Sequence, residues 1–310
     1  MRFMSRKTPS MLMSQLNTKT FTFTGELEPE KTTNLAHIME AAQKLKGYVV
    51  ACNVTDNPQS FAYLSSLAAS HLIQKETGME TIYQVTCRDR NRMALFSDLL
   101  GAGALGIRNI LALTGDHTTL GDTPQAKPVF DFDSMQLIHM TRNIVGKGVD
   151  MNGKAVECPP FFCIGAGANP NANPLEPELI KLGKKVQAGA DFFQTQVVFN
   201  IEIAKTFLKE AGQYNVPILI GIFPLKSYGV AEYFDKNVPG VRVPKELLHE
   251  LAKAREIEDK VKRREKCNGI NFDYFTGFIK ELKKTTSAAG CHIMSVGYEE
   301  IIPPLIEAVM

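Results

Sequence analysis

Several side chains capable of acid–base or hydrogen-bond chemistry stand at the ends of short apolar runs. The clearest is Asp116, which closes the run 108–115 in a Thr-Gly-Asp turn. The others are Glu26, Glu28, Thr55, Asp56, Gln84, Thr86, Asn169, Gln196, Lys226 and Tyr228. Any one of them could be an internally bonded residue or a helix cap, as for Asp56 or Asp116. Two acids, two amides and an aromatic ring that converge on one opening indicate a binding or catalytic site.

The runs that carry these residues are short, rich in β-branched and aromatic residues, and separated by amphipathic stretches. The predicted strands are residues 20–25, 48–54, 81–86, 109–114, 160–165, 191–197, 217–223 and 291–296. The predicted helices between them include residues 35–45, 61–76, 90–104, 134–144, 177–188 and 201–211. This alternation predicts a single-domain (β/α)8 TIM barrel, in which the active site lies at the C-terminal ends of the strands.

Two segments exceed the eight repeats of a simple barrel. Residues 1–19 carry basic residues and scattered methionines, which predicts a flexible or helical N-terminal extension before a barrel of residues 20–310. Residues 244–262 and 272–284 predict two consecutive helices between the seventh and eighth strands. Gly101 to Gly106 match the G-x-G-x-x-G pattern, but a helix precedes and a strand follows, so we expect a turn at the bottom of the barrel rather than a dinucleotide site.

Composition limits the class of ligand. The net charge of the 310-residue chain is only +2, which favours neither nucleic acid nor a membrane surface as a partner. No apolar run approaches the ~20 residues that span a bilayer, so we expect a soluble, cytoplasmic protein. The six cysteines form no Cys-x-x-Cys pair, and we expect no intrinsic metal centre. The expected ligand is therefore a small molecule.

Five blocks of sequence, taken together, resemble the methylenetetrahydrofolate reductase family. They are Phe23-Thr24-Gly25-Glu26-Leu27-Glu28-Pro29, Asn53-Val54-Thr55, Gln84-Val85-Thr86-Cys87, Leu111-Ala112-Leu113-Thr114-Gly115-Asp116, and the segment 184–190 with Thr195-Gln196. They occur in the family's order, and the likeness extends from about residue 20 to residue 308. The resemblance implies a flavoprotein oxidoreductase that reduces 5,10-methylenetetrahydrofolate to 5-methyltetrahydrofolate in one-carbon metabolism.

The resemblance also implies roles for individual residues. Glu26 matches the general acid, and Asp116 matches the carboxylate beside the flavin and the pterin. Gln196 and Tyr228 match residues that bind the substrate. Residues implied to contact the flavin are Thr55, Gln84, Asp116, Asn169, Glu178 and Lys185.

The cofactor and the electron source stay open at this stage. FAD and FMN, bound non-covalently, are both compatible with the sequence, as are reduced nicotinamide and a protein electron donor in a partner subunit. We expect an oligomer of identical or different subunits. Two other hypotheses remain: a flavin-free methyltransferase or lyase barrel that binds folate, and a barrel subunit without catalytic activity.

Overall fold

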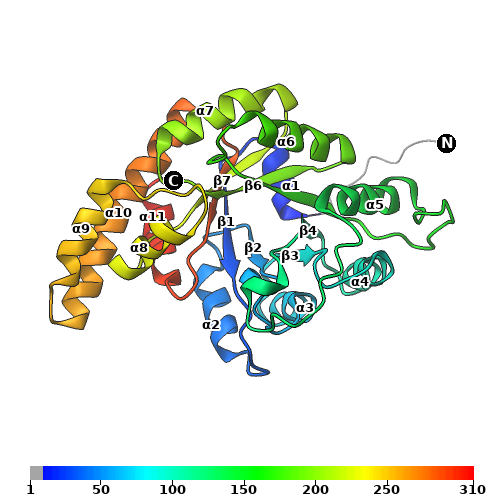
Figure 1. Cartoon of the computed structure of the whole chain (residues 1–310), viewed down its shortest axis with the longest axis horizontal. Helices are drawn as coiled ribbons and strands as arrows, with labels where there is room; N and C mark the ends of the chain where they lie inside the picture. Colours follow the sequence, from blue (N-terminus) through cyan, green and yellow to red (C-terminus); the bar gives the residue numbers. More distant parts are fainter. Residues whose placement is uncertain (1–9) are drawn as a thin grey trace.

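Eight parallel strands close into a barrel in the order of the sequence, with β8 paired to β1 (Figure 1). The structure is a computed structural model that describes residues 10–310. The strands are β1 (Thr22–Leu27), β2 (Ala51–Val54), β3 (Thr81–Thr86), β4 (Asn109–Leu113), β5 (Cys163–Ala168), β6 (Phe192–Val197), β7 (Ile218–Ile222) and β8 (Gly290–Ile293). The predicted (β/α)8 barrel is therefore confirmed.

Helices surround the barrel and follow its strands (Figure 1). They are α2 (Ala36–Leu45), α3 (Ser66–Thr77), α4 (Arg92–Ala104), α5 (Ser134–Lys147), α6 (Glu176–Ala188), α7 (Ile201–Ala211), α8 (Tyr228–Asn237), α9 (Lys245–Arg255), α10 (Lys260–Thr285) and α11 (Ile302–Glu307). Short 3-10 turns are η1 (Pro58–Ser60), η2 (Thr118–Leu120), η3 (Gly212–Tyr214) and η4 (Glu299–Ile301). Many helix starts follow from local sequence, because Ser65, Asn91 and Ser227 each accept a hydrogen bond from a backbone N–H in the first turn.

Two predicted boundaries near functional residues were wrong. β1 ends at Leu27 rather than at residue 25, so Glu26 lies on the strand itself. β5 begins at Cys163, beyond Pro160, which has no N–H to donate to a neighbouring strand.

The predicted break between the two helices that precede β8 was also misplaced. The chain breaks after Arg255, and Asp259 then caps a continuous 26-residue helix, α10. The helix α10 continues through residues 263–271, where a break was predicted. The side chain of Asn271 is buried in this part of the helix, and every hydrogen-bonding group of its amide has a partner. The amide accepts from the Leu225 N–H at 2.6 Å and donates to the Leu225 and Cys267 carbonyls at 3.0 and 2.8 Å.

A short helix, α1 (Met11–Asn17), covers the N-terminal end of the barrel. Its Leu12 and Leu16 are buried among side chains that fill the barrel interior, including Leu111 and Phe192. The carboxylate of Glu80 fixes this helix by accepting from the Met11 and Leu12 N–H groups at 2.9 and 3.1 Å. The side chains of α1 therefore close the barrel interior at its base, and the opposite end is left for a ligand.

A tight turn leads from α4 into β4 at the same end of the barrel. Gly106 takes a φ of +83°, which a residue with a side chain rarely adopts. The glycine-rich segment 101–106 thus ends a helix and precedes a strand, as predicted. No helix among residues 10–310 is long and apolar enough to cross a membrane.

Candidate active site

A cavity of about 400 Å³ opens at the C-terminal ends of the strands. We call it the mouth cavity. Its floor and walls include apolar residues of β4 and β5, and its polar lining comes from several other strands, the loops after β4 and β5, and the helices α5 and α6. The polar residues of this lining include Glu26, Asn53, Gln84, Asn169, Glu178, Lys185, Gln194, Gln196 and His292. Most of the predicted site residues therefore meet at one opening, while Thr55, Asp116 and Tyr228 lie outside its lining.

Glu26 extends from β1 toward His292 of β8. The Oε2 atom of Glu26 lies 3.4 Å from Nε2 of His292, and only 14% and 4% of the two side chains are exposed. The other ring nitrogen, Nδ1, lies 3.0 Å from the hydroxyl of Thr24. The imidazole is thus held between a hydroxyl and the carboxylate that the sequence predicts to be the acid.

Two buried amides extend this chain of contacts. The side chains of Asn53 and Gln194 donate to each other at 2.8 and 3.0 Å, and Gln194 also donates to the Thr24 hydroxyl at 3.1 Å. The Thr24 hydroxyl therefore accepts from Gln194 while it contacts Nδ1 of His292, and Nε2 of the same ring faces Glu26.

Sequence reasoning missed His292, Thr24 and Gln194. A usable signal existed, because Thr24 and Glu26 are two residues apart on β1, and Gln194 and Gln196 are two apart on β6. Side chains at this spacing face the same side of a strand. Polar residues at alternate positions of otherwise apolar strands therefore mark the barrel interior.

The side chain of Lys185, on α6, lines the mouth cavity next to β5. Its ammonium donates to the Gly167 carbonyl at 2.6 Å. Burial lowers the pKa of Lys185 from its usual value, and the charge of Glu178 partly opposes that effect. Glu178 also accepts from the Asn169 N–H at 2.9 Å, which fixes the loop after β5. Hydrogen bonds to the end of β5 and the loop after it thus hold the three predicted cofactor residues Asn169, Glu178 and Lys185 in place.

An irregularity in β6 places Gln196 at the opening. The pairing of β6 with β7 shifts between Gln194 and Val197. Gly221 permits the shift, because a Cβ there would lie 2.3 Å from the Thr195 carbonyl oxygen. Such bulges redirect side chains. Gln196 is exposed, and its side-chain oxygen accepts from the Val197 N–H at 2.8 Å, which leaves the NH₂ group available to a ligand.

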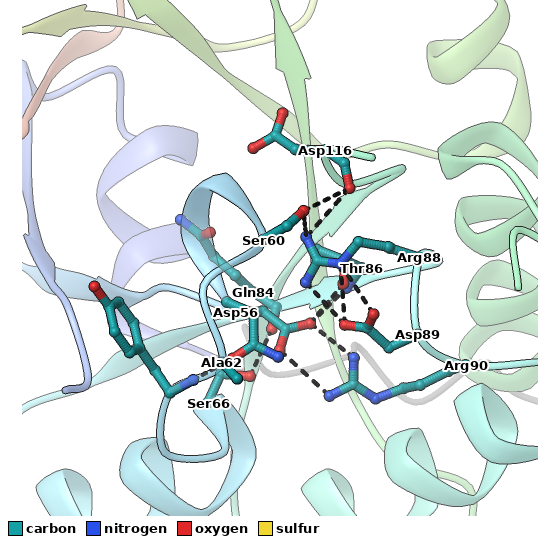
Figure 2. Close-up of polar contacts among 12 residues, drawn as sticks. Asp56, Ser60, Ala62, Ser66, Gln84, Thr86, Arg88, Asp89, Arg90 and Asp116 are labelled. Atoms are coloured by element: carbon teal, nitrogen blue, oxygen red, sulfur yellow. Dashed lines mark hydrogen bonds and ion pairs between the residues drawn. The ribbon is translucent and has the colours of Figure 1, made fainter. Parts of the chain in front are cut away.

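Arg88 and Arg90 bond to residues of the loops that follow the strands beside the mouth cavity (Figure 2). Arg88 is 2% exposed and donates from its NH1 group to the Ser60 hydroxyl at 3.2 Å. The Ser60 hydroxyl in turn donates to the Asp116 carbonyl at 2.9 Å. The Asp116 carboxylate turns away from these contacts and is exposed (Figure 2). The loop therefore fixes the Asp116 backbone while its carboxylate stays accessible.

Neither Asp56 nor Asp116 caps the next helix. Asp56 accepts from the Thr86 N–H and hydroxyl, both at 2.9 Å, and from Arg90 at 2.8 Å (Figure 2). Its neighbour Thr55 is buried, and its hydroxyl has no hydrogen-bond partner. A buried hydroxyl without a partner is uncommon, and a ligand atom could satisfy it.

Tyr228 begins α8 and faces a second cavity beside the mouth. The guanidinium of Arg255 lies 5.6 Å from the centre of its ring, and the Tyr228 hydroxyl contacts Glu232 at 3.4 Å. The structure therefore separates Tyr228 from the residues that line the mouth cavity.

Glu28 follows β1 on the same side as Glu26. Burial raises its pKa to about 7, with smaller contributions from the negative charges of Glu26 and Glu30 and an opposing one from Lys226. A carboxyl with a pKa near 7 can gain or lose a proton under ordinary conditions, which is typical of functional sites.

Among residues 10–310 no three His, Cys, Asp or Glu side chains are grouped to hold a metal ion.

Comparison with known proteins identifies the family of this chain. A family model described as methylenetetrahydrofolate reductase matches residues 11–309. The chain belongs to the methylenetetrahydrofolate reductase family. The predicted family resemblance is thereby confirmed.

Individual relatives are distant and longer. A probable methylenetetrahydrofolate reductase (NADPH) of Caenorhabditis elegans is 29% identical over 64% of this chain and 28% of its own length. Methylenetetrahydrofolate reductase 1 of Schizosaccharomyces pombe is 24% identical over 92% of this chain and 45% of its own length. An NADH-named reductase of Arabidopsis thaliana is 26% identical over 81% of this chain and 42% of its own length. The chain thus spans less than half of each of these relatives.

A solved structure from Clostridium thermocellum has the same fold. It superposes with a TM-score of 0.62 and 18% sequence identity, and the match covers 97% of this chain and 98% of that one. That protein binds two copies of 5-methyl-5,6,7,8-tetrahydrofolic acid. At this identity the likeness establishes the fold alone.

Proposed function

We propose that this protein reduces 5,10-methylenetetrahydrofolate to 5-methyltetrahydrofolate with a bound flavin. The observation that carries the proposal is the buried pair of Glu26 and His292 at the edge of the mouth cavity, in a chain of this family. The folate-binding structure of the same fold supports the choice of substrate class.

Glu26 is the general acid of this proposal. The methylene carbon of the substrate bridges two nitrogens, and it accepts hydride only after one C–N bond has broken. The nitrogen that leaves must be protonated, so a carboxyl group near it speeds the step. Glu26 is held on a rigid strand and is mostly shielded from water, which suits a group that must deliver one proton to one atom.

His292 positions Glu26 and stabilises it after the proton has left. In the tautomer that carries its proton on Nε2, the ring donates to Oε2 of Glu26, which leaves Oε1 free to carry the proton toward the substrate. When Glu26 becomes a carboxylate, the same N–H donates to a full negative charge, and such bonds are stronger than neutral ones. His292 thereby favours transfer without touching the substrate.

The remaining lining fits a flavin. The apolar residues of β4 and β5 suit a planar ring, Gln84 can bond its polar edge, and Lys185 supplies a cation for a phosphate. Asn169 and Glu178 hold the loop that would contact the sugar-like arm. When bound, a reduced flavin supplies the hydride.

The substrate is assigned to the exposed side chains at the rim of the barrel. Gln196 has a free NH₂ group for the pterin, and the exposed Asp116 carboxylate can accept from the pterin's amino edge. Tyr228 borders the neighbouring cavity, where it can contact a longer part of the ligand. Relatives named for NADPH and for NADH support reduced nicotinamide as the electron source, and a partner subunit is the other candidate. FAD and FMN both suit the residues named.

Purification and half-reaction kinetics test the proposal. The protein should be yellow, with the absorbance bands of an oxidised flavin. Glu26→Gln should retain the flavin and its reduction by the donor, but should lose roughly 10²–10⁴-fold in folate reduction, because an amide cannot supply the proton.

Two outcomes would contradict the proposal. Colourless protein that still binds folate would favour a flavin-free transferase or lyase, and parent-like folate reduction by Glu26→Gln would remove Glu26 as the acid. Glu210→Gln, which changes an exposed carboxylate on α7, is the matched control.

A further inference from the structure

A second cavity, of about 490 Å³, lies beside the mouth between the loop after β7 and the facing parts of α9 and α10. We call it the basic cavity. Five cationic side chains line it: Lys226, Arg255, Lys260, Arg263 and Arg264. No carboxylate of residues 10–310 is part of its lining. Figure 1 shows α8, α9 and α10 gathered on this side of the barrel.

Much of this positive charge has no acidic partner. Lys260 forms no ion pair with a residue that the structure describes, and Lys226 donates only to the Val296 carbonyl, at 3.3 Å. Arg263 donates to the Glu258 carbonyl at 3.1 Å, while its buried Nε has no partner. Clustered cations repel one another, and a buried donor without a partner is costly. An anion in the cavity would offset the repulsion between these cations.

The other two arginines of the lining, Arg264 and Arg255, each contact an aromatic ring. Arg264 pairs with Glu300 and lies 4.4 Å from the centre of the Tyr298 ring. Arg255 lies over Tyr228. Both guanidinium groups are therefore held in place and present their remaining N–H groups to a ligand.

The basic cavity is next to the mouth cavity. Met294, just after β8, lines the mouth, and the carbonyl of nearby Val296 accepts from Lys226. Lys226 also lies close enough to Glu28, beyond the end of β1, to act on its charge. A molecule whose ring system occupies the mouth can therefore extend a charged end past the segment after β8.

We propose that the basic cavity binds the multiply charged oxyanion end of a reactant whose ring occupies the mouth. The identity of the reactant rests on the proposed function. Two sources share this chemistry: the carboxylates of a folate's γ-linked glutamate tail, and the diphosphate of a nicotinamide dinucleotide. Both carry several oxyanions away from the reacting ring, at the far end of the folate and between the two nucleosides of the dinucleotide.

Binding measurements on the full chain distinguish the sources. The first pair of probes is 5-methyltetrahydrofolate with one and with five γ-linked glutamates. The second pair is NADPH and reduced nicotinamide mononucleotide. We expect the more highly charged member of one pair to bind at least about 10-fold more tightly than the other member at low salt. This preference should decline as salt is added, because salt screens charged contacts in an open cavity.

Variants from two elements then test the cavity itself. The double variant Lys260→Ala/Arg263→Gln and the separate variant Lys226→Met should each reduce that preference. Lys262→Ala, which removes an exposed lysine of the same helix, should retain it. Thermal unfolding verifies that each variant is folded. Equal affinities within both pairs, or a preference that survives both sets of changes, would overturn the proposal.

Probes without a ring separate this inference from the proposed function. Free penta-γ-glutamate and pyrophosphate should bind saturably and lose affinity in the double variant. If they do so while no folate binds, the proposed function fails and the anion site stands. If folate binds but neither an added tail nor the free anions respond to the variants, the anion site fails and the proposed function stands.

Discussion

Replacing Glu28 by glutamine should stabilise the protein near neutral and alkaline pH and have little effect at acid pH. Glu28 is half-buried, and burial raises its pKa to about 7, helped by the charges of Glu26 and Glu30 and opposed by Lys226. The folded protein therefore holds this carboxyl as an acid more readily than the unfolded chain does.

The sign of the effect follows from proton binding. Between the usual pKa of 4.5 and the folded value of about 7, the folded state binds more protons at Glu28 than the unfolded state does. The free energy of unfolding consequently falls as pH rises through this window and levels off above it. A shift of one pKa unit corresponds to about 1.4 kcal/mol, so the whole shift sets an upper limit of about 3 kcal/mol. Partial exposure to solvent reduces the expected gain in Glu28→Gln to about 1–3 kcal/mol at pH 8.

Denaturant unfolding at pH 5 and pH 8 measures the difference directly. Glu28→Gln should gain stability over the parent at pH 8 and much less at pH 5, whereas Glu210→Gln, at an exposed position of α7, should show no such pH dependence. Glu26→Gln should reduce the pH dependence of the parent, because the charge of Glu26 is the second cause of the shift. An equal effect of Glu28→Gln at both pH values would refute the argument.

Two further predictions concern the mouth cavity. Lys185→Ala should weaken flavin retention by about 1.5–3 kcal/mol in equilibrium dialysis, the range for a hydrogen bond to a charged group, while Lys184→Ala on the exposed side of α6 should not. His292→Leu should slow folate reduction in stopped-flow experiments by roughly 10–100-fold, a part of what general acid catalysis contributes, and leave flavin reduction by the donor near the parent rate. Equal losses in both half-reactions would instead indicate that His292 has a general structural role.

The barrel could be predicted from the sequence because its signals are local. Each strand is a short β-prone run that ends near a polar residue, and each helix has its own apolar stripe and often its own cap, such as Ser65 before α3 or Asn91 before α4. The course of α10 was predicted wrongly because Asn271, which resembles a loop residue in sequence, is satisfied by Leu225 of a distant loop. Local pattern cannot reveal a partner 46 positions away.

The same limit explains what was found and what was missed in the site. Glu26, Gln84, Lys185 and Gln196 stand in blocks that resemble the family, and they do line the mouth cavity. Asp116 was conspicuous in sequence for its turn, yet the turn fixes its backbone and leaves its carboxylate outside the cavity lining.

His292 is the residue that best explains the proposed role of Glu26, and no local sequence pattern indicated it. His292 lies 266 positions from Glu26, and only closure of β8 onto β1 brings the two side chains together. Register then decides the geometry: Thr24 pairs with His292 across the two strands, so the Thr24 hydroxyl lies 3.0 Å from Nδ1 while Nε2 faces Glu26. A shift of one residue in that pairing would turn the imidazole out of the barrel, because alternate side chains of a strand face opposite sides. The pairing of Glu26 with His292 is therefore a property of the closed barrel rather than of the Glu26 segment alone.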